Sequence, residues 1–176
     1  MRPPPIFATI LVAAIFVASL CAFSFAQTPI RARTIAATDQ IIVEKAAHRM
    51  TLMKQGRVVR TYQVALGRGG PGPKVEAGDN KVPEGVYRIT GRNPVSAYHL
   101  SLRIGYPTTS QAQRARRAGI DPGADIMIHG IRNGLGWLGS QHRKMDWTKG
   151  CIAVTNKEIE EIWRLVPDRT LVEIRV

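Results

Sequence analysis

Short runs in which apolar and polar residues alternate dominate the chain beyond residue 39. A period of two is typical of half-buried β-strands. The pattern predicts strands at Gln40 to Lys45, Arg49 to Lys54, Arg57 to Ala65, Val86 to Thr90, Tyr98 to Ile104 and Thr170 to Val176. Gln55-Gly56 is a turn signal between the second and third runs, so we expect the first three strands to form an antiparallel meander.

Two segments favour a helix. Thr155-Asn156-Lys157-Glu158 is a capping-box pattern, in which the first hydroxyl and the last carboxylate satisfy backbone N–H groups at a helix start. The apolar residues that follow at helical spacing are Ile159, Ile162, Trp163 and Val166, which assigns Trp163 to the core rather than to a ligand. Ser110 to Ala118 is basic and helix-permissive, with Gly119 as its stop. The pattern predicts a mainly β fold with one or two helices.

The N-terminus has the features of a secretory signal. Arg2 precedes residues 6–25, which carry no charge, and small residues lie before Gln27. We therefore expect residues 1–26 to be a signal peptide, 27–38 a short tether and 39–176 a single domain. The apolar run is about long enough to span a bilayer, so an uncleaved anchor stays an alternative and would be the only membrane contact. Either case locates the domain in the periplasm or cell envelope.

Charge and cysteine content narrow the partners. The chain has 25 Lys and Arg against 13 Asp and Glu, a net charge of +12, which suits nucleic acid, an anionic membrane or an acidic wall polymer. Export argues against nucleic acid. Removal of residues 1–26 leaves Cys151 as the one cysteine, so no internal disulfide can form. The thiol is then either a small buried hydrophobe or a reactive group.

Ile126 to His129 is an apolar run that predicts a buried strand with its histidine at the end. A thiol and an imidazole are the minimum pair for covalent acyl transfer, because the ring can take the thiol proton. We assign Cys151 as nucleophile and His129 as general base. The Gly130 carbonyl would orient the ring, and Gly150 would let the oxyanion approach backbone N–H groups.

Further polar residues are candidates for substrate contact. The loop from residue 131 to 145 is long enough to wall a site. One face of the Tyr98 to Ile104 strand is polar, and positive charge near the thiol would lower its pKa or hold a substrate carboxylate. The candidate substrate-binding residues are His99, Arg103, His142, Trp147, Thr148 and Lys149.

Other readings of the same residues remain open at this point. His142 or His99 is an alternative base. His99, His129, His142 and Cys151 have the right ligand types for zinc, but no two are closely spaced, so we expect no metal and no cofactor. A non-catalytic wall-binding module would be favoured if Cys151 were far from every imidazole.

The Ile128-His129-Gly130 segment, a loop, and then Thr148-Lys149-Gly150-Cys151-Ile152 with Asn156 and a helix after it resemble the active-site signature of the L,D-transpeptidases, the YkuD-like catalytic domain. Residues 78–87 are similar to the segment that precedes the site in that family, and the resemblance covers Gln40 to the C-terminus. It implies a β-sandwich-like domain with Cys and His facing each other across a cleft. It also implies an acyltransferase that forms a Cys151 thioester with peptidoglycan stem peptides, in cell-wall cross-linking or lipoprotein attachment.

One position departs from the commonest family pattern. Lys149 stands where a second histidine usually precedes Gly-Cys, whereas the presumed base, here His129, is kept. The residues around Cys151 look closest to a subgroup that includes an amidase, which detaches lipoprotein from peptidoglycan. A hydrolase of the same fold, acting on peptidoglycan–lipoprotein or L,D-peptide links, therefore stands beside the transpeptidase. The implied partners are peptidoglycan stems and a wall-attached lipoprotein.

Overall fold

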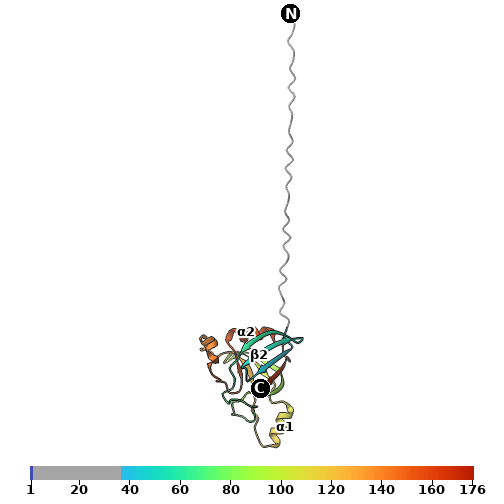
Figure 1. Cartoon of the computed structure of the whole chain (residues 1–176), viewed down its shortest axis with the longest axis vertical. Helices are drawn as coiled ribbons and strands as arrows, with labels where there is room; N and C mark the ends of the chain where they lie inside the picture. The colour runs from blue at the N-terminus through green and yellow to red at the C-terminus, as the bar shows by residue number, and fades with distance from the viewer. Residues whose placement is uncertain (2–36) are drawn as a thin grey trace. The chain divides into compact units, whose positions relative to one another are not determined.

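The computed structural model of the protein describes Met1 and residues 37–176 (Figure 1). The predicted signal peptide and residues 27–36 of the predicted tether lie outside the described residues. Within the part that is described, no helix is both long enough and apolar enough to cross a membrane.

Eight strands form the framework of the domain. They are β1 (Gln40–Glu44), β2 (Arg49–Lys54), β3 (Arg57–Gln63), β4 (Gly85–Ser96), β5 (His99–Ile104), β6 (Met127–His129), β7 (Ile152–Ala153) and β8 (Leu171–Arg175). Their order in the sheet is β3-β2-β1-β8-β4-β5-β6-β7. The mainly β prediction is confirmed, and the first three strands form the expected antiparallel meander.

β4 is more than twice as long as the predicted strand from Val86 to Thr90, because its 12 residues continue through Asn93-Pro94 to Ser96. Register shifts between β4 and β5 in this region accommodate the proline, which cannot donate to a regular ladder. The first residues of β4 pair with β8 and the later ones with β5, so one strand belongs to both halves of the sheet.

The sheet bends around a single core. Ile41 and Leu52 of one half and Leu102, Ile128 and Ile152 of the other belong to one buried apolar cluster. Beyond the end of β3, Ala65 forms an antiparallel bridge to Ala153 in β7. The two ends of the sheet therefore meet at the segment that follows β3, and burial of this shared core favours the closed form.

Three helical segments complete the domain: α1 (Thr109–Arg117), the 3₁₀ segment η1 (Gly136–Lys144) and α2 (Asn156–Leu165). α2 begins with the predicted capping box between Thr155 and Glu158, and α1 has a similar box between Thr108 and Gln111. α1 and α2 lie at opposite ends of the domain (Figure 1). α2 covers the core, whereas α1 buries no residue.

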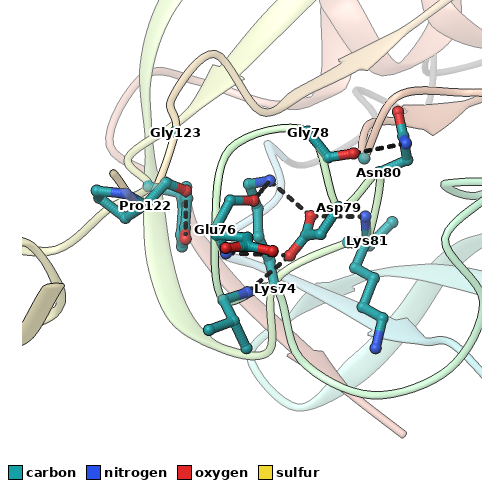
Figure 2. A network of polar contacts seen from close by, with 12 residues as sticks. Lys74, Glu76, Gly78, Asp79, Asn80, Lys81, Pro122 and Gly123 are labelled. Atoms are coloured by element: carbon teal, nitrogen blue, oxygen red, sulfur yellow. Dashed lines mark hydrogen bonds and ion pairs between the residues drawn. The ribbon is translucent and has the colours of Figure 1, made fainter. Parts of the chain in front are cut away.

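One carboxylate organises the loop between β3 and β4. Asp79 accepts hydrogen bonds from Lys74 Nζ at 2.8 Å and from the backbone N–H groups of Val75, Glu76 and Lys81 (Figure 2). Burial alone would raise the pKa of Asp79, but these hydrogen bonds outweigh it and lower the pKa to about 2. The folded loop thus favours the charged carboxylate.

Asp79→Asn is expected to lower the free energy of unfolding by about 2 kcal/mol near neutral pH and by much less at about pH 2. The pKa of Asp79 in the folded state lies below its unfolded value, so the stabilisation is complete above about pH 4 and is lost as the pH falls through about 2. Urea unfolding of both proteins across this range measures the difference.

Asp168→Asn is the matched control, because that carboxylate is 64% exposed and lies outside the loop. Its effect should stay below about 0.5–1 kcal/mol. An Asp79→Asn effect of equal size at both ends of the pH range would contradict the expectation.

Candidate active site

His129 and Cys151 meet at the pairing of β6 with β7. These strands run parallel, with Ile128 opposite Ile152 and His129 opposite Ala153. Side chains alternate between the two faces of a sheet. Ile128 and Ile152 enter the core, so His129 and Cys151 both project to the other face. They line one cavity of about 270 Å³.

The turn that carries Cys151 is fixed from several sides. Thr148 exchanges backbone hydrogen bonds with the segment from Leu66 to Arg68. The buried Thr148 hydroxyl donates to the Cys151 carbonyl at 2.8 Å and accepts from the Gly150 N–H at 3.2 Å. Thr148 therefore braces the turn, and the Gly150 N–H is already occupied.

A residue with a side chain would be strained and crowded at position 150. Its φ is 111°, and a Cβ built there would lie 2.7 Å from the Lys81 carbonyl oxygen. The loop organised by Asp79 thus packs directly against the residue before the cysteine. Outside the regular strand pairing, the Cys151 N–H has no acceptor within residues 37–176, so it is a candidate donor to an oxyanion.

His129 is buried, and its Nδ1 lies 2.6 Å from the Gly130 carbonyl oxygen. A carbonyl only accepts, so Nδ1–H donates and Nε2 keeps the lone pair of the neutral ring. Burial lowers the pKa of His129, and the bond to Gly130 opposes this in part. Asn156 Oδ1 accepts the next N–H, that of Ile131, at 2.8 Å, which fixes the backbone around the ring.

The thiol is partly buried, and its Sγ donates to the Asp125 carbonyl at 3.6 Å. Burial raises the pKa of Cys151, and a Met127 backbone hydrogen bond and the Lys74 charge lower it only in part. Both members of the pair are therefore uncharged at rest. The arrangement suits proton transfer to His129 during attack rather than a preformed thiolate.

Some basic residues line the cavity directly, and another reaches it only through an ion pair. Arg68 and Lys149 line it, and neither forms an ion pair within residues 37–176. Arg103 does not line it, but pairs at 2.9 Å with Asp125, which does. The charge of Lys74, which the sequence analysis did not single out, lowers the pKa of Cys151 in part.

Aromatic rings form one wall of the cavity. The Tyr98 ring lies 4.6 Å from the His129 ring, between centroids, and 6.0 Å from the Trp147 ring, on which it stacks. Trp147 meets His129 edge to face at 5.7 Å. Trp147 Nε1 donates to His142 Nδ1 at 3.3 Å, so the contacts run from His142 through Trp147 to His129.

His99 and His142 are not brought to this cavity. His99 has a left-handed φ of 69°, and its Nε2 lies 2.7 Å from Glu160 on α2. His142 lines a neighbouring, mainly apolar groove of about 570 Å³, which shares Tyr98 and Trp147 with the cavity. Among the described residues, no three potential metal ligands gather at one point, so the four candidate zinc ligands do not form a site there.

The sequence reasoning missed five residues of the cavity. The alternating pattern predicted that His99, and not Tyr98, would face the site. The left-handed φ at His99 breaks that pattern, and Tyr98 lines the cavity instead. The other four have no local motif that would mark them. The missed residues are Arg68, Ser96, Tyr98, Asp125 and Met127.

Comparison with known proteins agrees with this geometry. The family model of the L,D-transpeptidase catalytic domain, YkuD, matches residues 38–174. YafK of Escherichia coli (strain K12), which is described provisionally as an L,D-transpeptidase, is 31% identical over 115 residues, or 64% of this chain and 39% of YafK. The chain thus spans about two fifths of the length of the curated relatives it matches.

Solved structures share the fold. The helical cell shape determining protein Pgp2 from Campylobacter jejuni superposes with a TM-score of 0.58 at 22% identity, covering 80% of this chain and 48% of Pgp2. An L,D-transpeptidase from Xylanimonas cellulosilytica gives a TM-score of 0.53 at 16% identity, covering 80% and 61% of the two chains. The fold predicted from the sequence is confirmed.

The Cys151 thiol is expected to titrate above the ordinary cysteine pKa of about 8.5, because burial disfavours the thiolate. The thiolate absorbance at 240 nm, taken as the difference between the protein and Cys151→Ala, should rise only above that pH. Both proteins keep Cys21, so the difference isolates one thiol. A thiolate present at pH 7 would instead indicate a preformed ion pair with His129.

Proposed function

Because the chain belongs to the L,D-transpeptidase catalytic domain family, we propose that it is an exported cysteine acyltransferase acting on peptidoglycan stem peptides. The observation that carries the proposal is the shared cavity of Cys151 and His129, in which Gly130 ties down one ring nitrogen and leaves the other as a base. A non-catalytic wall-binding module has no need of this arrangement.

The first half of the reaction forms a thioester. The Sγ–H turns from the Asp125 carbonyl toward Nε2 of His129, which takes the proton as sulfur attacks the amide carbonyl of the stem. The tetrahedral intermediate collapses when the amine leaves and receives that proton from Nε2. The acyl group is then bound to Cys151, and His129 is neutral again.

The turn from Thr148 to Cys151 stabilises the negative charge that develops on the substrate oxygen. The oxyanion of the intermediate accepts from the Cys151 N–H, which Gly150 and Thr148 hold in position. A donor of this kind typically contributes about 3 kcal/mol to transition-state stabilisation. Arg68 and Lys149 bind the carboxylates of the stem, and Trp147 with Tyr98 shields the imidazole.

The second half decides between two activities. An amine acceptor attacks the thioester and gives its proton to His129. The C–S bond then breaks to leave a new amide, and His129 returns the proton to the Cys151 sulfur, which restores the thiol. Water in the same position gives a carboxylic acid, so a hydrolase that cleaves peptidoglycan–lipoprotein or L,D-peptide links is the second candidate. The hydrolase is kept as a candidate because Lys149 stands where the family usually has a histidine.

Cys151→Ala is expected to abolish product formation on purified peptidoglycan, a fall of at least about 10³-fold, while the unfolding midpoint changes little. Mass spectrometry of muropeptides separates the activities, since new cross-links indicate transfer and released peptide or lipoprotein without cross-links indicates hydrolysis. Full activity in this variant would exclude the thiol from the mechanism. Val95→Ala, at an 88% exposed position outside the cavity, is the control.

The acidic limb of the kcat/KM profile is expected below the ordinary histidine pKa of about 6.5, because burial lowers the pKa of His129 and keeps the base unprotonated to a lower pH. Activity should thus persist at pH values where an exposed histidine would be largely protonated. Initial rates on soluble muropeptides across the pH range measure this limb. A midpoint above 6.5 would argue against the buried ring as the base.

A further inference from the structure

His142 is a buried histidine that the mechanism above does not use. It is 6% exposed and lines the apolar groove, not the cavity that holds Cys151. Its Nδ1 accepts from Trp147 Nε1 at 3.3 Å, and its Nε2 has no partner within residues 37–176. Burying an imidazole costs free energy unless it is hydrogen-bonded, so the bond to Trp147 is the contact that accounts for a polar ring here.

Trp147 in turn touches the imidazole of His129. The two rings meet edge to face at 5.7 Å, and Tyr98 packs against both. An indole has a single polar hydrogen, and in Trp147 that hydrogen is used by His142. The orientation of the ring beside the base therefore depends on a residue on the far side of it.

We propose that His142 is a positioning residue: its hydrogen bond holds the Trp147 indole against His129 and keeps water from the ring of that base. The inference rests on the proposed function in taking His129 as the base. His142 touches neither substrate nor the reacting atoms. Its effect passes through Trp147.

The bond requires a neutral His142, because only an unprotonated Nδ1 accepts a hydrogen bond. Burial and the Arg143 charge lower the pKa of His142 to about 4, although Glu158 opposes this in part. The acceptor is thus available across the working range of the enzyme. Arg143 itself is held by Glu158 through two contacts of 2.7 and 2.6 Å, which keeps its charge near His142.

Other polar and charged groups face the two rings. On the groove side of His142 they are Arg132, Gln141 and Lys144. On the cavity side of His129 they are Arg68, Ser96, Asp125, Thr148, Lys149 and Cys151. None of these donates to the Trp147 indole or replaces His142 as its acceptor, so removal of His142 leaves the indole without a partner.

The test compares His142→Leu with His142→Gln, because a glutamine oxygen can still accept from Trp147. In His142→Leu the base becomes hydrated and its pKa rises toward about 6.5, so kcat/KM should fall about 10-fold near pH 5.5 and less than about threefold near pH 8. His142→Gln should stay within about threefold at both. His48→Asn, which removes an exposed histidine outside the cavity, should change neither value.

A second readout needs no substrate. The ¹⁵N titration of the His129 ring should move to higher pH in His142→Leu, and the Trp147 Nε1–H resonance should shift. An unmoved titration, or a glutamine variant that behaves like leucine, would overturn the proposal. Equal loss of rate at every pH would do so too, because it would mark a merely structural residue. A wild-type protein inactive on peptidoglycan would refute the proposed function and leave this readout intact.

Discussion

The site depends on the parallel pairing of two very short strands. β6 and β7 share two residue pairs, and this register sends two isoleucines into the core and leaves His129 and Cys151 on the opposite face. Burial of Ile128 and Ile152 is thus what fixes the positions of His129 and Cys151, since a shift of one residue would exchange core and cavity side chains. The free energy that aligns the site comes mainly from apolar packing.

Burial also sets the charge state of the pair. The thiol and the imidazole are each shifted toward their neutral forms by loss of solvent, in opposite directions of pKa. A neutral pair needs no counter-charge. Tyr98 and Trp147 pack against the His129 ring and exclude water from it. The packing of these two rings thus helps to set the pKa of His129.

The sequence predicted what local rules control. Alternation located β1 to β3 to within two residues, and the capping box located the start of α2. Cys151 and His129 line one cavity, and their roles as nucleophile and base stay a prediction from their chemistry. Where the chain departs from local rules, prediction failed. The turn at His99 has a left-handed residue, so the period of two pointed to the wrong neighbour and Tyr98 was missed. The influence of Lys74 on the thiol depends on tertiary contacts that no spacing encodes.

The closure of the sheet has a consequence for assembly. β7, which follows the cysteine directly, pairs with β6 on one side. On its other side Ala153 pairs with Ala65, in the segment just after β3. These partners come from distant parts of the chain, and such contacts form only after a large loss of chain entropy. A fragment that contained both the cysteine and the histidine but lacked the first three strands and the segment after them could not form the Ala65–Ala153 bridge. The arrangement of Cys151 beside His129 is therefore among the last features that the folding chain acquires.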